Sequence, residues 1–253
     1  MTADPVTLMI LTGTFLLAGT VKGVIGLGLP TVSLALLAVA FDLTTAMALL
    51  LVPSLVTNLW QAFDGAYFNS LMRRLWPFFL CAVVTVWLGA IALNYWSLVW
   101  LTAMLGVLLV IYAGLSLVGW RPAIRSSQEV WSGPVSGVVN GVLTGMTGSF
   151  VVPGVMYLQA LGLQRDQLIQ AMGILFSLST LALAGALQTN RFISTELLVY
   201  SSGALLPALL GMLIGRGIRQ SLSEIRFRRI FFYSILLLGA YIVVSATYAA
   251  IAE

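Results

Sequence analysis

Two glycine-rich interruptions lie inside otherwise apolar segments, and the first of them adjoins the single lysine of the chain. The first runs from Gly23 to Pro30, directly after Lys22, and the second runs from Gly141 to Ser149. Non-helical backbone at membrane depth is tolerated only inside protein or against a watery cavity, and glycine lets a ligand approach the main chain. Each break would expose a helix N-terminus, whose free N–H groups and positive dipole end favour an anion.

Lys22 is the residue beside the first break that could carry a charge into the membrane. Charged side chains inside a membrane are expensive and are candidates for function. Binding of an anionic substrate is one interpretation, and a side chain that extends to the lipid headgroups is the alternative. Asn140 occupies the matching place in the second half of the chain, so a site built from both halves would be asymmetric.

The candidate substrate-binding residues combine Lys22 with the glycines and polar side chains of the breaks and with amides on neighbouring apolar segments. They are Lys22, Gly23, Gly26, Gly28, Asn58, Gln61, Asn140, Thr144, Gly145, Thr147, Gly148, Ser149 and Gln188. The alternative for the glycines is close helix packing, and the alternative for the uncharged polar groups is interhelical hydrogen bonding.

Few residues in this chain could support catalysis or bind a metal ion. Histidine is absent and Cys81 is the only cysteine, so we expect no catalytic residues, no metal site, no cofactor and no intrachain disulfide. A Ser–Lys pair that uses Lys22 is the one enzymatic arrangement that can be constructed. Asp42 and Asp64 lie at the ends of apolar runs, so proton coupling through a buried carboxylate lacks an obvious carrier.

The composition predicts an integral membrane protein. Of 253 residues, 60% are hydrophobic and 8% are charged, whereas soluble domains carry roughly 25% charged residues. A spanning helix needs about 20 apolar residues, which leaves room for about six to eight spans and only short loops. The net charge of +4 comes from arginines between apolar runs, which the positive-inside rule explains without a nucleic-acid partner. The N-terminus lacks the basic region of a cleaved signal peptide.

The order of segments suggests an internal duplication. We expect a first membrane repeat over residues 1–120, a cytoplasmic linker over 121–130 and a second repeat over 131–253. The sequence Gly19-x-x-Lys22-Gly23 in the first half corresponds to Gly137-x-x-Asn140-Gly141 in the second, and Pro77 corresponds to Pro207. The predicted fold is therefore an all-α integral membrane protein with two inverted repeats. Each repeat has a broken or re-entrant helix pair followed by three transmembrane helices.

Charge supports a re-entrant hairpin for each broken pair. With the loop 216–229 placed in the cytoplasm, five further arginines fall inside under this model, and Arg191 falls in an outside loop. The five are Arg73, Arg74, Arg121, Arg125 and Arg165. If each broken pair crossed the membrane once instead, the bias would weaken. Inverted repeats with broken helices are typical of secondary transporters.

The two breaks also carry a family resemblance. The segments from Gly19 to Pro30 and from Gly137 to Pro153, together with Pro207-x-x-x-Gly211-x-x-x-Gly215, resemble the TSUP family, also called the TauE/SafE or sulfite-exporter-like family. The chain departs from it where the family often has consecutive glycines in both breaks. The resemblance implies transport of small anions, notably sulfite and organosulfonates, across a bacterial inner membrane.

The leading hypothesis is a multi-pass membrane transporter, either an exporter or a facilitator, for a small sulfur-containing anion bound between the two breaks. An anion channel, a transporter of small carboxylates and a structural subunit are the alternatives. The expected partners are the small anionic substrate and the lipid bilayer, with no nucleic acid, and a homodimer is left open.

Overall fold

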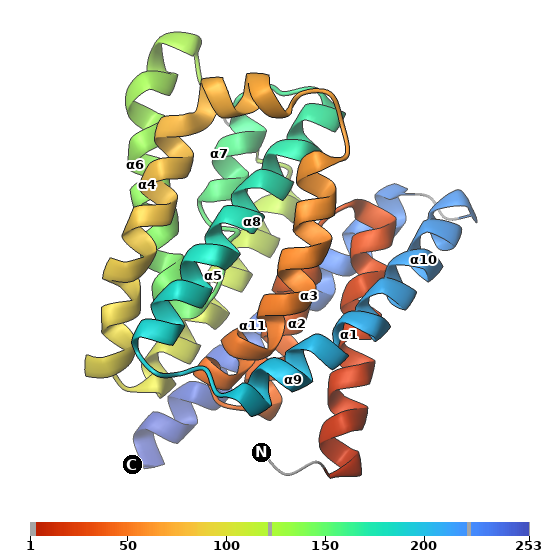
Figure 1. Cartoon of the computed structure of the whole chain (residues 1–253), viewed down its shortest axis with the longest axis vertical. Helices are drawn as coiled ribbons and strands as arrows, with labels where there is room; N and C mark the ends of the chain where they lie inside the picture. The colour runs from red at the N-terminus through yellow and green to blue at the C-terminus, as the bar shows by residue number, and fades with distance from the viewer. Residues whose placement is uncertain (1–3, 121–122, 222–223, 253) are drawn as a thin grey trace. The chain divides into compact units, whose positions relative to one another are not determined.

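The computed structural model describes residues 4–120, 123–221 and 224–252, and within these ranges α-helices are the only regular elements (Figure 1). They are α1 (Pro5–Ile25), α2 (Leu29–Ala40), α3 (Leu43–Phe63), α4 (Phe68–Tyr95), α5 (Leu98–Val118), α6 (Ser126–Thr147), α7 (Gly154–Ala160), α8 (Arg165–Thr189), α9 (Thr195–Gly203), α10 (Leu205–Ser221) and α11 (Glu224–Ala252). The predicted all-α class is confirmed.

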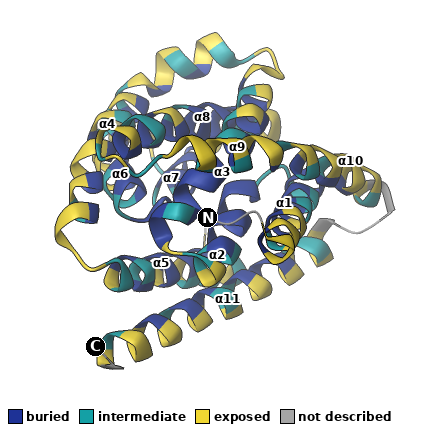
Figure 2. Ribbon diagram, turned by 60° about the horizontal axis from the view of Figure 1, so that its bottom comes forward, coloured by how far each residue is buried: buried dark blue, intermediate teal, exposed yellow. Residues whose placement is uncertain are grey.

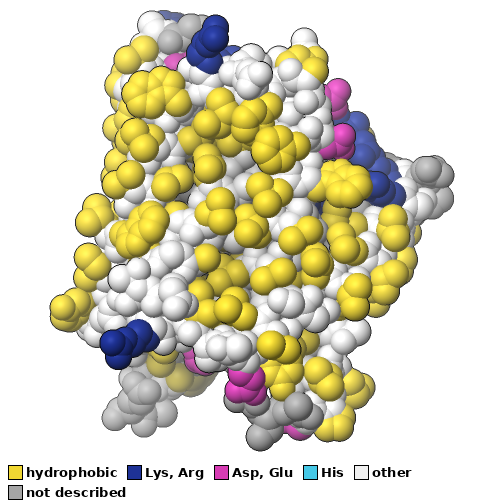
Figure 3. All heavy atoms as spheres, viewed as in Figure 1, with side chains coloured by type: hydrophobic (Ala, Val, Ile, Leu, Met, Phe, Trp, Pro, Cys, Tyr) yellow, Lys and Arg dark blue, Asp and Glu magenta, His cyan; other side chains and the backbone are white. Residues whose placement is uncertain are grey.

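Seven of the described stretches are long and apolar enough to span a membrane. They are α1, α3, α4, α5, α8, the α9–α10 stretch over Thr195–Arg219, and α11. Large apolar side chains on several of them stay exposed, such as Trp76 and Leu88 on α4 and Tyr233 and Leu237 on α11. On the face shown in Figure 3, hydrophobic side chains cover the middle and charged side chains lie toward the margins. Such a surface requires lipid as its solvent, so the chain is a multi-pass membrane protein.

Three element boundaries differ from the sequence-based expectations. Residues 126–130, predicted as linker, belong to α6, while Arg121 in the same linker lies outside the described residues. The predicted second break from Gly141 to Ser149 begins too early, because α6 continues through Thr147. One of the three transmembrane helices expected in the second repeat is two helices over Thr195–Arg219, which meet at Ala204 between α9 and α10.

The helices form two compact units, and each unit draws on both halves of the sequence. Unit 1 comprises Met1–Pro53, Trp96–Gly119 and Arg191–Glu253, and unit 2 comprises Ser54–Tyr95 and Trp120–Asn190. The division passes through α3. The predicted repeat boundaries describe a duplication of sequence, which these compact units do not follow, and the inverted duplication stays a prediction.

In unit 1, α1 packs against α10, α5 packs against α11, and α2 returns alongside α1. Two glycines of α1 make the first contact close: a Cβ added to Gly19 would meet the carbonyl oxygen of Ala208, and one added to Gly23 would meet that of Met212. Glycine at such positions lets two helix backbones approach. Along α11, buried and exposed residues alternate with the helical turn (Figure 2).

In unit 2, α4 packs along α6, and α8 and α7 complete the group. Gly137 and Gly141 of α6 lie against the backbone of α4, where an added Cβ would meet carbonyl oxygens. The Thr85 hydroxyl donates to the carbonyl of Val138 at 3.0 Å across the same interface. Near one end, Arg74 donates to Glu129 at 2.6 Å and 3.0 Å, so that two bonds join α4 to α6.

Candidate functional site

The first break is a short turn between α1 and α2 that is made by glycine. Gly26 ends α1 with a φ of 77°, and its N–H donates to the carbonyl of Lys22 at 2.8 Å. Gly28 precedes α2 with a φ of 107°, and its carbonyl accepts the N–H of Val32 at 2.8 Å. Pro30 lies in the first turn of α2, where proline costs no hydrogen bond. The break therefore exposes the start of a new helix, as the sequence predicted.

Lys22 lies in the last turn of α1, and its side chain is 4% exposed. A lysine that reached the headgroups would bury its methylene stem but keep its ammonium group exposed. The burial therefore argues against that alternative and leaves Lys22 as a basic side chain inside the protein. Its role in substrate binding remains a prediction.

Two of the predicted site glycines are helical and lie at helix contacts. Gly23 is part of α1 and faces α10, while Gly145 is part of α6 and faces the carbonyl of Val86 on α4. Their positions match the packing interpretation of these glycines. Among the predicted site glycines, only Gly26, Gly28 and Gly148 lie where a described helix ends or begins.

The second break is more polar than the first, and its hydroxyl groups are used locally. Gly148 ends α6 with a φ of 74°. The Thr144 hydroxyl donates to the carbonyl of Ser149 at 3.0 Å, and the Thr147 hydroxyl donates to the carbonyl of Leu143 at 2.7 Å. The Ser149 N–H in turn donates to Thr147 Oγ1 at 3.2 Å. The bond to Leu143 satisfies the Thr147 hydroxyl within the helix, while the bonds that involve Ser149 show the hydroxyls shaping the turn.

Asn140 connects the two sides of the second break. It is fully buried in α6, and its Oδ1 accepts the N–H of Gly154, the first residue of α7, at 2.9 Å. Among the described residues, its Nδ2 has no hydrogen-bond partner. The sequence singled out Asn140 only because it stands at the place of Lys22 in the repeat.

Gly154 is a residue that the sequence reasoning missed. A Cβ at this position would lie 2.5 Å from Asn140 Oδ1 and 2.9 Å from Leu175 Cδ2, so only glycine brings the chain close enough to the amide. The signal was a glycine directly after Pro153, at the start of an apolar segment.

Within unit 2, polar side chains of α3 and α8 form a seam of hydrogen bonds that joins the two helices. Asn58 Nδ2 donates to Ser54 Oγ at 3.0 Å, and Ser54 Oγ lies 3.2 Å from Thr180 Oγ1. Gln61 Nε2 donates to the carbonyl of Ile169 at 2.7 Å. Gln188 is exposed near the end of α8 and lies apart from these bonds. The seam matches the alternative of interhelical hydrogen bonding.

Gln170 strengthens the same seam and was not among the predicted site residues. Its Nε2 donates to the carbonyl of Ala62 at 2.9 Å, and its Oε1 accepts the N–H of Tyr67 at 3.0 Å. It thereby ties α8 to the connection between α3 and α4.

The described residues hold no group of three or more His, Cys, Asp or Glu side chains that could bind a metal ion. A family model described as Sulfite exporter TauE/SafE matches residues 11–242. The chain belongs to the TauE/SafE sulfite exporter family. This is a family of membrane transporters and not of enzymes. Comparisons with curated proteins and with solved structures found no match.

Proposed function

We propose that this TauE/SafE family member transports a small sulfur-containing anion, such as sulfite or an organosulfonate, across a bacterial inner membrane. The observation that carries the proposal is the buried Asn140 amide, whose Oδ1 is held by Gly154 while its Nδ2 has no partner among the described residues. Oxygen atoms of a sulfur oxyanion would accept the hydrogen bonds that Nδ2 offers.

An unpaired amide donor at this place calls for an explanation. Buried polar groups without a partner are rare, and each costs about 1–3 kcal/mol. The residues after Gly148 are non-helical up to α7, so the backbone beside Asn140 belongs to an interruption. In a transporter, such an interruption is where a substrate would be held. A substrate that accepts hydrogen bonds would compensate the cost of the free donor.

Lys22 would contribute charge. An anion inside the membrane must be stabilised by a positive group or by hydrogen bonds. Lys22 is a buried basic side chain in α1, at the first break. Because it belongs to unit 1 and Asn140 belongs to unit 2, the two residues are tested separately.

The test is flux in proteoliposomes that contain the full chain. Sulfite, one small sulfonate, sulfate and acetate would be compared for the wild type and for Lys22→Gln, Asn140→Leu and Asn94→Leu. Asn94 is an exposed amide at the end of α4 and serves as the matched control. Hydrogen bonds to charged groups contribute about 1.5–3 kcal/mol, so we expect transport to fall roughly ten- to hundredfold in the first two variants and little in the control.

Several outcomes would count against the proposal. Transport of acetate alone would assign the protein to carboxylates, and flux without saturation or exchange would indicate a channel. An Asn140→Leu protein that is folded and transports sulfite as fast as Asn94→Leu does would remove Asn140 from the binding site. The same result for Lys22→Gln would make Lys22 structural.

A further inference from the structure

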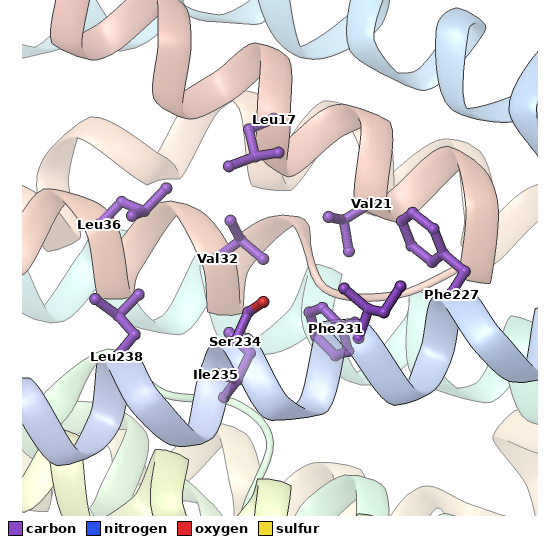
Figure 4. Close-up of a pocket in the computed structure, with 10 residues that line it drawn as sticks. Leu17, Val21, Val32, Leu36, Phe227, Phe231, Ser234, Ile235 and Leu238 are labelled. Atoms are coloured by element: carbon purple, nitrogen blue, oxygen red, sulfur yellow. The ribbon is translucent and has the colours of Figure 1, made fainter.

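A groove of about 220 Å³ lies between α1, α2 and α11 in unit 1 (Figure 4). Its floor is formed by Val21, Val32, Phe231 and Ile235, which are buried. Its rim includes Leu17 and Ile230, which are exposed. The groove is thus closed below by packed side chains and open along a surface that faces lipid in a membrane protein.

The length of the groove suits one leaflet of a bilayer. Its lining on α11 extends from Phe227 to Leu238, which at 1.5 Å per residue is about 16 Å. The hydrocarbon core of a bilayer is about 30 Å thick, so one leaflet contributes roughly 15 Å. An acyl chain aligned with α11 could therefore lie along most of the groove.

One end of the groove is basic. Arg226 precedes Ile230 by one helical turn and Ser234 by two, so all three lie along the same edge of α11. The Arg226 side chain is exposed. Arg228 instead packs over the ring of Phe232, at 5.6 Å from the ring centroid.

We propose that this groove binds an anionic phospholipid of the surrounding bilayer. One acyl chain lies between α1, α2 and α11, and the phosphate contacts Arg226 at the basic end. Neutral lipid would satisfy the apolar floor equally well, so the arginine selects the anionic headgroup. Basic side chains near a membrane surface attract anionic lipids in this way.

The bound lipid would also contact the side chains that pack on the first break. A Cβ added to Gly28 would lie 3.0 Å from Val21 Cγ1 and 3.4 Å from Phe231 Cε2, and both side chains line the groove. An acyl chain in the groove therefore braces the turn between α1 and α2. Binding should stabilise unit 1 without any transported substrate, so it can be tested independently of the proposed transport.

The test uses the full chain in a neutral detergent. Phosphatidylglycerol and phosphatidylcholine with the same acyl chains are titrated, and bound lipid is counted by native mass spectrometry while Tm is recorded. We expect phosphatidylglycerol to bind more tightly and to raise Tm more. Arg226→Gln should weaken its binding about fivefold. Arg229→Gln is the matched control, because Arg229 is exposed on the same helix, nearly opposite the groove.

Ser234→Trp tests the groove itself, because Ser234 is an exposed lining residue and a large side chain there would fill the groove. We expect it to lose binding of the phospholipid while its Tm in detergent alone is kept. Equal binding of the two lipids by the wild type, equal weakening by Arg226→Gln and Arg229→Gln, or unchanged binding by Ser234→Trp would each overturn the proposal. Glycerol 3-phosphate, which lacks the acyl chain, should not raise Tm.

Discussion

The glycine interface of unit 1 and that of unit 2 repeat one packing arrangement. In unit 1, Gly19 and Gly23 of α1 approach the carbonyl oxygens of Ala208 and Met212. Ala208 directly follows a proline of α10. The spacing of four residues on both helices keeps the two contacts on one face of each helix.

In unit 2 the glycines contact the neighbouring helix with the same four-residue spacing. Gly137 and Gly141 of α6 approach the carbonyl oxygens of Phe78 and Ala82 on α4. Phe78 also directly follows a proline. In both units the first helix of one sequence half therefore packs on a proline-containing helix of the other half, at equivalent residues.

The two breaks differ in their polar side chains, although the glycine packing of the helices beside them is the same. Lys22 stands beside the break of unit 1, and Asn140 stands at the matching place in unit 2. The first break is made by Gly26 and Gly28, whereas the hydroxyls around Gly148 shape the second. Backbone packing is thus common to both units, and the side chains that could recognise a substrate are specific to each.

The largest loss of stability is expected when a methyl group is added where two helix backbones touch. Gly23→Ala and Gly141→Ala each place a methyl group against a backbone carbonyl, and overpacking costs roughly 1–3 kcal/mol. Both variants should lower Tm in detergent by similar amounts. Gly13→Ala in α1 is the control: no atom lies within 4 Å of the added Cβ, so Tm should stay or rise. A loss of stability in only one unit would break the equivalence of the two interfaces.

A loss of stability of intermediate size is expected from substitutions that test the backbone conformation of the two breaks. Asparagine tolerates the left-handed region, where Gly148 lies with a φ of 74°, but not the φ of 107° at Gly28. Gly28→Asn should therefore cost roughly 1–3 kcal/mol in unfolding free energy, and Gly148→Asn about 1 kcal/mol or less. Thermal or denaturant unfolding of the two variants measures the difference. Equal losses would show that backbone conformation does not distinguish the breaks.

The smallest effect concerns the residues that precede α3 and α8, the second helix after each break. Asp42 accepts the Thr45 N–H at 3.0 Å before α3, whereas Gln164 precedes α8 with an uncharged side chain. Partial burial opposes the charged form of Asp42, but hydrogen bonds from Thr44 and Thr45 outweigh it and lower the pKa of Asp42. Its contribution is therefore present above about pH 4 and is lost as pH falls further.

Asp42→Asn should accordingly lower stability at pH 7 by less than about 1 kcal/mol, because Asp42 is exposed and solvent screens its interactions. The difference from the wild type should shrink toward pH 3. Gln164→Asn should show no such pH dependence. Unfolding midpoints measured across this pH range would show whether the two variants differ in this way. A difference from the wild type that stays constant for Asp42→Asn would contradict a stabilising role of the charged Asp42 carboxylate.

Much of the fold followed from local sequence, and the errors have a common cause. The long apolar runs predicted the spans, and Gly26 and Gly28 marked the first break correctly. The second break was placed too early because a polar run was taken for a non-helical one. Thr147 satisfies its hydroxyl on the carbonyl one turn back, so a polar residue can stay helical without water.

The candidate site was less predictable than the fold. The spacing of Asn58 and Gln61 put them on one helix face, but only the structure shows that Gln61 is bonded to the carbonyl of Ile169. Likewise, Gln188 shares its residue type with the buried amides and yet lies exposed at a helix end. Residue type and spacing describe one helix, while the bonding partner lies on another.

The sequence by itself determined that this protein lies in a membrane, that two glycine-rich turns interrupt its helices and that it resembles sulfite exporters. These properties depend on composition and on short segments, so neighbouring residues suffice to state them. Only the tertiary structure decided that Asn140 bonds Gly154 across a break and that Val21, Val32 and Phe231 share one groove. Those properties depend on residues brought together from separate helices, because a hydrogen bond and a packed floor exist only where the backbones meet.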